Sequence, residues 1–258
     1  MNELTAKKIN IGGIGISNVY FKEVVGIFNK SIDSNTKRRV CVTPVNCIIW
    51  ANKNSTLKEI YNSADLTLCD GVPVIWASKF LGKKIKERVT GLDLLPVYIE
   101  ECYKRNYSMF FLGAQEGVAE QLKQKCEELY PGIKIKGIYT PPFAKKFTEE
   151  ENLKMINLVN ETNPDILWVS LSAPKQDYWI SEHFDKLNAK IIIGVGGAFE
   201  VTAGLIKRAP VFLQKNGLEW FYRFYKEPLR LFKRYFVEAP VFLPIVLKQW
   251  VKERRFFL

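Results

Sequence analysis

Residues 64–74 read ADLTLCDGVPV, an apolar run that stops at an aspartate and a glycine before a second apolar run begins. Asp-Gly is a common turn dipeptide, so this stretch has one simple interpretation as the tip of a β-hairpin. The segment that follows, VPVIWASKFLG, has the length and composition of a buried helix rather than of a second strand. A strand followed by a crossover helix is typical of a parallel sheet, which predicts that Asp70 stands at the carboxyl end of a strand.

The same alternation of short apolar runs and longer helical patterns continues to about residue 205. Strands are predicted over 9–14, 39–43, 65–69, 107–112, 133–139, 165–171 and 190–195. Helices are predicted over 17–30, 55–63, 72–82, 92–105, 115–129, 148–161, 174–187 and 216–235. This order predicts an α/β fold, a Rossmann-like, mostly parallel sheet covered by helices on both faces. A C-terminal helical appendage that is basic and aromatic follows it.

The basic charge of the chain is concentrated in that appendage. The net charge of the 258-residue chain is +11, and residues 201–258 hold twelve lysines and arginines against four glutamates. Residues 217–258 also carry 12 of the 34 aromatic residues. A basic, aromatic segment predicts contact with an anionic surface, and composition leaves open whether this is membrane headgroups or nucleic acid.

Several classes of site are not indicated by the sequence. The five cysteines form no C-x-x-C pair, and His183 has no partner at metal-ligand spacing and is expected to be exposed in the polar stretch EHFDK. The glycine stretches GGIGIS and GVGGAF match a dinucleotide fingerprint only in part and are interpreted as tight turns or core packing. Reduced, buried cysteines fit a cytoplasmic chain better than a disulfide framework. No signal peptide and no stretch near the roughly 20 apolar residues of a spanning helix is found, so the protein is not expected to be integral to a membrane.

Candidate site residues come from the strand ends, because ligands of such sheets bind beyond the carboxyl ends of the strands. Thr43, Asp70, Gly113 and Gly196 stand at these junctions, and Asp70 is the carboxylate at a strand tip itself. One interpretation makes Asp70 a helix N-cap and the other a general base, and the two roles are compatible.

The appendage offers a second set of candidates. On a helical wheel of about 100° per residue, Arg223, Arg230 and Arg234 fall on one polar arc, although Pro228 is expected to kink or divide the helix. The arc is either a solvated face or a site for phosphate, which bidentate arginine suits well. The chain has no D-x-D, so a bound diphosphate would be met by Arg, Lys and backbone N–H groups.

Four blocks of sequence, in this order, carry a family resemblance: CVTPVN with LCDGVPVIW, then ERVTGLDLLP, then APKQDYWI, then GVGGAFEVTAGLIKRAP followed by GLEWFYRFYKEPLRLFKRY. Over about residues 9–236 the chain resembles the WecG/TagA/CpsF family of bacterial glycosyltransferases. The resemblance implies inverting, metal-independent transfer, without a cofactor, of N-acetylmannosamine or a related sugar from a UDP-sugar. The implied acceptor is a polyprenyl-diphosphate-linked sugar of surface polysaccharide or teichoic acid synthesis, at the inner face of the cytoplasmic membrane.

The resemblance also assigns roles to residues. It implies Asp70 as the catalytic base, with Thr43 beside it, in a catalytic domain over 1–205 that holds the donor site. The appendage, 206–258, is expected to contact the acceptor and the membrane. The substrate-binding set consists of the strand-tip glycines Gly113 and Gly196 and, from the resemblance, of Asn46, Arg88, Lys175, Gln176, Arg223, Arg230 and Arg234, with Lys233 as the alternative to Arg234.

Three positions depart from the family pattern, namely Ser172, Asp177 and Glu200, which put the identity of the sugar in doubt rather than the reaction class. The resemblance further implies self-association into a homo-oligomer, which no segment of this sequence demonstrates. The rival interpretation, a basic nucleic-acid-binding module, also uses Arg, Lys and aromatic residues but leaves the strand-tip cluster unexplained. No nucleic-acid partner is therefore expected.

Overall fold

A computed structural model describes residues 6–215 and 217–254, apart from the side chains of Lys215 and Arg230. The strands are β1 (Lys8–Ile11), β2 (Ile14–Ser17), β3 (Arg38–Thr43), β4 (Leu66–Cys69), β5 (Ser108–Gly113), β6 (Lys134–Tyr139), β7 (Ile166–Ser170) and β8 (Ile191–Gly194). Six of them form a sheet of order β4-β3-β8-β7-β5-β6 in which every pairing is parallel. The predicted α/β class and the six strand positions from 39 onward are confirmed.

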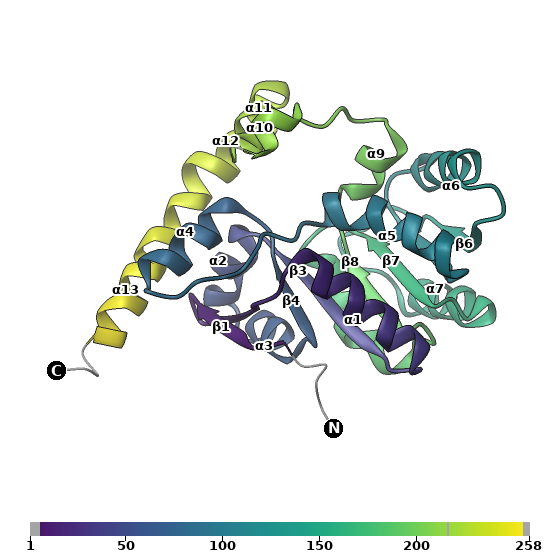
Figure 1. Cartoon of the computed structure of the whole chain (residues 1–258), viewed down its shortest axis with the longest axis horizontal. Helices are drawn as coiled ribbons and strands as arrows, with labels where there is room; N and C mark the ends of the chain where they lie inside the picture. The colour runs from purple at the N-terminus through teal and green to yellow at the C-terminus, as the bar shows by residue number, and fades with distance from the viewer. Residues whose placement is uncertain (1–5, 216, 255–258) are drawn as a thin grey trace.

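The α-helices cover both faces of this sheet (Figure 1). They are α1 (Phe21–Asp33), α2 (Val45–Lys53), α3 (Ser55–Ser63), α4 (Val72–Phe80), α5 (Gly91–Arg105), α6 (Val118–Leu129), α7 (Glu149–Thr162), α8 (Lys175–His183), α9 (Ala198–Ala203), α10 (Val211–Lys215), α11 (Glu219–Lys226), α12 (Pro228–Phe232) and α13 (Phe242–Arg254). Buried residues of α1, α5 and α6 pack on one face, and those of α2, α3, α7 and α8 pack on the other.

The strands are buried because alternate side chains point to opposite helical layers. In β3, Val40 and Val42 belong to the cluster under α1 and α5, whereas Cys41 belongs to the cluster under α2 and α3. Every residue of β5, β7 and β8 is buried. This double burial fixes the register of the strands and brings their carboxyl ends to one edge of the sheet.

The strand predicted over 9–14 is wrong. These residues belong to a separate antiparallel hairpin, β1–β2, whose turn consists of Gly12 and Gly13 with φ of +60° and +84°. Glycine adopts this left-handed backbone at no steric cost, so the chain reverses there instead of continuing. The interpretation of GGIGIS as a tight turn is confirmed.

Other helix predictions also need correction. Helix α2 was not predicted, because VNCIIWANK is apolar almost all round and shows little helical periodicity. The helix predicted over 216–235 begins at a residue outside the described part of the chain, and it is divided at Pro228, as expected from the sequence. Pro228 has no N–H to continue α11 and instead opens α12. His183 is buried against Trp179 rather than exposed, because α8 turns that face toward α7 and the sheet.

The appendage packs along one side of the domain, where α13 lies beside α4 and α2 in Figure 1. Phe242 and Val246 of α13 enter the hydrophobic cluster of α2 and the hairpin. Gln249 accepts a hydrogen bond from the Gly12 N–H at 2.6 Å and donates to the Asn10 carbonyl at 2.9 Å. The last described helix is therefore fastened to the first hairpin of the chain.

Candidate functional site

Asp70 lies where β3 and β4 end side by side. Thr43 pairs with Cys69, and the Asp70 N–H donates to the Thr43 carbonyl at 3.3 Å. Gly71, with φ of +131°, is the N-cap of α4 and makes no side-chain cap bond. The N-cap role considered for Asp70 is therefore wrong, and the carboxylate is not used to begin the helix.

The surroundings of Asp70 set its acidity. Burial of the carboxyl raises its pKa to about 6, and the positive charges of Arg88, Arg234 and Arg223 oppose this rise while the negative charge of Glu219 adds to it. Burial disfavours the charged form and nearby cations favour it. A carboxylate with a pKa near 6 is ionised at neutral pH yet basic enough to accept a proton, as a general base requires.

Thr43 presents an unusual hydroxyl beside this carboxylate. The residue is fully buried at the end of β3, and its Oγ1 has no hydrogen-bond partner among the described residues. An unsatisfied buried hydroxyl costs folding free energy, so such groups are rare away from sites where a ligand completes the bonding. Thr43 therefore has a free donor and acceptor next to the Asp70 backbone.

Asn46 connects the core to the appendage. It lies in the first turn of α2, donates through Nδ2 to Glu238 Oε2 at 3.0 Å, and accepts through Oδ1 from Arg234 Nε at 3.4 Å. Arg234 and Glu238 belong to a π-helical turn, Lys233–Glu238, that follows α12. These bonds bring the predicted appendage arginine to the strand tips.

The other two appendage arginines are placed by their helices. Arg223 lies half-buried in α11 and acts on Asp70 through its positive charge. Arg230 lies in α12, but its side chain is outside the described part of the chain. The structure thus brings Arg223 and Arg234 toward Asp70, and the role of Arg230 stays a prediction.

A second group of predicted residues lies at the ends of β5, β7 and β8. Gln176 Oε1 accepts from the Gly196 N–H at 3.1 Å, and Ser170 Oγ donates to the Gly196 carbonyl at 2.8 Å. Gly113 lies against Ser170, whose carbonyl oxygen would be 2.4 Å from a Cβ at position 113. Because β8 is the neighbour of β3, these interlocked loops adjoin the Asp70 group.

Lys175 is occupied by a contact of its own. Its ammonium donates to the Ala144 carbonyl at 2.7 Å and lies 4.1 Å from the centre of the Phe147 ring. Burial lowers the pKa of this lysine. In this conformation Lys175 holds the segment after β6 in place, and its predicted contact with the donor stays untested.

Two of the positions that depart from the family pattern are carboxylates, Asp177 buried and Glu200 half-buried. Asp177 accepts a hydrogen bond from the Tyr61 hydroxyl at 2.9 Å, and burial raises its pKa to about 7. Glu200, in α9, has a buried Oε2 that is without a partner among the described residues. Asp177 thus joins α8 to α3, and Glu200 leaves an acceptor beside the Gly196–Gly197 loop.

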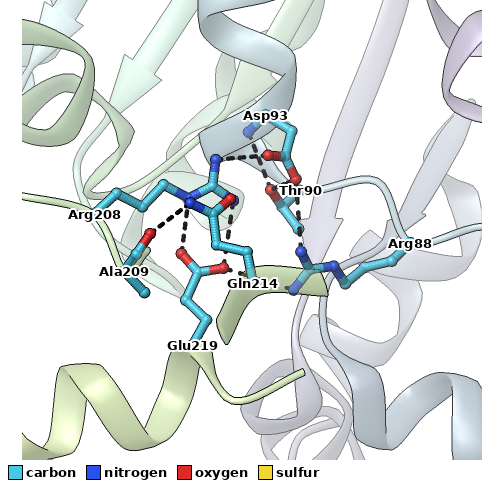
Figure 2. A network of polar contacts seen from close by, with 7 residues as sticks. All are labelled: Arg88, Thr90, Asp93, Arg208, Ala209, Gln214 and Glu219. Carbon is cyan, nitrogen blue, oxygen red and sulfur yellow. Dashed lines mark hydrogen bonds and ion pairs between the residues drawn. The ribbon is translucent and has the colours of Figure 1, made fainter. Parts of the chain in front are cut away.

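Arg88 belongs to a charged network that the sequence did not predict (Figure 2). Its guanidinium lies 3.8 Å from both Asp93 and Glu219, and Arg208 pairs with the same two carboxylates. The three partners stand inside the blocks ERVTGLDLLP, GLIKRAP and GLEWFYRF. Their presence in those blocks was the available signal, but nothing in the spacing indicated that they meet.

Residues 6–215 and 217–254 contain neither a cluster of metal-ligating side chains nor a helix able to span a membrane. No group of three or more His, Cys, Asp or Glu side chains there is arranged to hold a metal ion. Over the same described ranges, no helix has both the length and the apolar character needed to span a bilayer.

Comparison with known proteins decides the family. The model of the "Glycosyl transferase WecG/TagA/CpsF family" matches residues 9–256, nearly the whole chain. The chain belongs to this family. The resemblance noted from the four sequence blocks is confirmed, and the protein is a glycosyltransferase.

Named relatives of this glycosyltransferase share one activity. An N-acetylglucosaminyldiphosphoundecaprenol N-acetyl-beta-D-mannosaminyltransferase of Bacillus spizizenii is 30% identical over 198 residues, which cover 77% of this chain and 74% of the relative. A protein of the same name from Staphylococcus aureus (strain MRSA252) is 26% identical over 218 residues, or 84% of each chain. Both relatives are thus named for transfer to an undecaprenyl-diphosphate-linked sugar.

Proposed function

We propose that this glycosyltransferase moves N-acetylmannosamine or a related sugar from a UDP-sugar to a polyprenyl-diphosphate-linked sugar, with inversion and with Asp70 as general base. The observation that carries the proposal is the Asp70 carboxylate at the strand tip, which does not serve as a helix N-cap. Its pKa is about 6, and it lies in the field of the positive charges of Arg88, Arg223 and Arg234. The names of the relatives support the sugar and the lipid-linked acceptor.

The geometry suggests one displacement step. The acceptor hydroxyl oxygen attacks the anomeric carbon while its proton passes to the Asp70 carboxylate, a transfer that typically contributes about 10² to 10⁴ in rate. The bond from the anomeric carbon to the diphosphate oxygen breaks, and its electron pair leaves with UDP. Attack from the face opposite the leaving group inverts the anomeric centre.

The charge that builds on the departing diphosphate needs compensation. Arg88, Arg223 and Arg234 are the cations whose fields reach Asp70, and fixed charges aimed at a developing anion stabilise the transition state. Guanidinium groups bind phosphate bidentately, so we propose that they, rather than a divalent metal, hold the diphosphate. Full transfer activity in the presence of EDTA is the expected result, and a requirement for Mg²⁺ or Mn²⁺ would contradict this part.

The Thr43 hydroxyl and the loop of Gly113, Gln176 and Gly196 complete the proposed donor side. Gln176 and Gly196 are already bonded to each other, which holds the loop in one shape before substrate arrives. The unpartnered Thr43 hydroxyl then gains its missing hydrogen bond from the bound substrate.

Contact with the membrane surface is proposed for the appendage together with α4. The appendage exposes apolar side chains along successive turns, among them Tyr225, Leu229, Phe232, Phe236, Leu243, Leu247 and Val251. Helix α4, which begins two residues after Asp70, exposes Trp76 and Phe80 at 62% and 51%, and the centres of the Phe80 and Trp250 rings are 5.8 Å apart. Exposed aromatic residues among lysines suit the headgroup region of an anionic bilayer, in keeping with a peripheral enzyme on the inner face of the cytoplasmic membrane.

The test compares UDP release by the wild type and by Asp70→Asn, using a panel of UDP-sugars and a prenyl-diphosphate-sugar acceptor. We expect the variant to bind UDP normally and to lose turnover by at least about a hundredfold. Asp185→Asn is the matched control, since Asp185 is exposed beyond α8 at the opposite edge of the sheet. Near-normal turnover of Asp70→Asn would remove Asp70 from the role of base.

The pH dependence gives a second check. Asp70 must be ionised to accept a proton, and its pKa is about 6, so the rate should fall as the pH drops through 6. If the residual transfer rate of Asp70→Asn falls at the same pH as that of the wild type, the titrating group is not Asp70. If the protein instead bound DNA or RNA in a salt-dependent manner and did not bind UDP, the nucleic-acid-binding alternative would hold.

A further inference from the structure

Four charged side chains form a closed ring between the core and the appendage (Figure 2). Arg208 Nη1 donates to Asp93 Oδ1 at 2.6 Å, and its Nε and Nη2 donate to the two Glu219 oxygens at 2.9 and 3.3 Å. Arg88 closes the ring at 3.8 Å from Asp93 and at 3.8 Å from Glu219. Two positive and two negative charges therefore alternate around the ring.

Arg208 and Glu219 belong to the appendage, and Arg88 and Asp93 belong to the core, so the ring joins the two regions. Glu219 is the member that α11 supplies. It is the first residue of α11 and is only 8% exposed, which is rare for a glutamate. A buried carboxylate is costly unless it is paired and hydrogen-bonded, and here the fork of Arg208 satisfies both oxygens. The position of α11 is thus tied to that of two arginines.

The core side of the ring is fixed in advance. Asp93 lies in the first turn of α5, and its carboxylate accepts from the Thr90 hydroxyl at 2.8 Å. Burial raises the pKa of Asp93, but hydrogen bonds from Arg208 and Thr90 outweigh this and hold the pKa below its usual value. Asp93 is therefore ionised at neutral pH, where it anchors the ring.

The two arginines of the ring are used differently. Arg208 donates hydrogen bonds to Asp93 and Glu219. Within the described residues, Arg88 makes only longer ion pairs with the same carboxylates. The N–H groups of Arg88 are therefore available to an incoming anion, and the carboxylates restrict where its guanidinium lies. This division suits one structural arginine and one substrate-facing arginine.

We propose that Glu219 is a positioning residue that docks α11 on the core through the Arg208–Asp93 pair and holds Arg88 beside Asp70. The backbone already places Arg88 there, because the N–H of the next residue, Val89, donates to the Cys69 carbonyl at 2.9 Å. The assignment of Arg88 to the diphosphate rests on the proposed function, whereas the docking of α11 does not.

Hydrogen exchange tests the docking without any assay of activity. In Glu219→Gln, the amides of α11 should exchange at least about tenfold faster than in the wild type, while those of β5 stay protected. Glu120→Gln is the matched control, because Glu120 is exposed on α6 far from the ring, and it should change neither. Unchanged exchange in α11 would overturn the anchoring role.

Turnover then tests the action through Arg88. We expect kcat to fall about tenfold in Glu219→Gln and to recover largely in Glu219→Asp, which keeps the charge. In an Arg88→Lys background, Glu219→Gln should cost little more, because the positioned group is already altered. Independent, multiplicative losses would show that Glu219 does not act through Arg88. Absence of transfer by the wild type would refute the proposed function, and the exchange result would still decide the docking.

Discussion

The parallel sheet and the C-terminal appendage are held in place by different forces. All residues of β5, β7 and β8 are buried, and their side chains are almost entirely apolar. In the appendage, by contrast, most described side chains are exposed or half-buried, and the buried ones between 206 and 254 are Ala209, Glu219, Leu231, Phe242 and Val246.

Because of this difference, substitutions in the two regions should have separate effects on the protein. The sheet is stabilised by area removed from water, which is spread over many residues and insensitive to any one polar contact. The appendage is held by separate contacts: the ion pairs of Glu219, the hydrogen bond from Asn46 to Glu238, and the packing and hydrogen bonds of α13 on the β1–β2 hairpin. Core substitutions should therefore unfold the protein, whereas appendage substitutions should change what the folded protein binds.

The largest effect on stability is expected in the sheet. Trp168, fully buried on β7 beside Tyr98, leaves a large cavity when shortened, so Trp168→Ala should lower the free energy of unfolding by about 3–5 kcal/mol. Trp220→Ala in α11, where the ring is 42% exposed, should cost about 1 kcal/mol or less. Denaturant unfolding measures both, and equal losses of unfolding free energy would show that the sheet and the appendage do not differ in this way.

The next effect concerns a buried carboxylate of the core. Burial raises the pKa of Asp177 to about 7 from an ordinary value of about 3.9, so between these values the folded chain keeps a proton that the unfolded chain has lost. The free energy of unfolding should accordingly fall as pH rises from about 4 to 7. Asp177→Asn should flatten this slope and gain on the order of 2 kcal/mol at pH 8 relative to the wild type.

Unfolding curves across this pH range decide the matter. Asp185→Asn, at an exposed position, should keep the slope of the wild type. A slope unchanged in Asp177→Asn would mean that the buried pair with Tyr61 does not titrate in this window.

A smaller effect, on binding alone, is expected at the outer surface of α4. Trp76→Ser should weaken binding to vesicles of anionic phospholipid roughly tenfold, since a buried aromatic side chain contributes about 1.5–3 kcal/mol, and should leave thermal stability unchanged. Leu129→Ser is the control, because Leu129 is 61% exposed on α6, at the far end of the molecule from α13 in Figure 1. Equal vesicle binding by the wild type and Trp76→Ser would show that the outer surface of α4 does not contact the membrane.

The smallest effect on stability is expected at Thr43. Its hydroxyl has no partner among the described residues and costs folding free energy, so Thr43→Val should raise the free energy of unfolding slightly rather than lower it, while transfer falls about tenfold. Thr67→Val on the adjacent strand is the matched control. The Thr67 hydroxyl donates to the Tyr61 carbonyl at 2.8 Å, so its loss should cost about 1 kcal/mol and spare transfer. The reverse outcome would make Thr43 a structural residue.

Much of the fold could be predicted because parallel strands have to be apolar on both faces. The runs around MFFL, ILWV and KIII are continuous for that reason, and the structure confirms them as β5, β7 and β8. Asp70 was placed at a strand end by the same argument. Its lack of an N-cap role was not predictable, because the glycine after it takes the cap with a backbone that no sequence pattern reports.

The charged ring and the course of the appendage could not be predicted for a different reason. Asp93 and Arg208 are 115 residues apart, and local periodicity carries no information on such a contact. The wheel that aligned Arg223, Arg230 and Arg234 used one α-helical period throughout, whereas the segment is divided into α11, α12 and a π-helical turn. That Arg223 and Arg234 still act on Asp70 reflects tertiary packing rather than the wheel.

The bonds from Gln249 to residues 10 and 12 have a consequence for how the protein folds. They join positions up to 237 residues apart, so the polar groups and the apolar face of the β1–β2 hairpin are covered only when α13 is in place. Contacts of such long range close late and slow the final step of folding. The surface that we propose meets the bilayer therefore depends on a contact that forms late in folding.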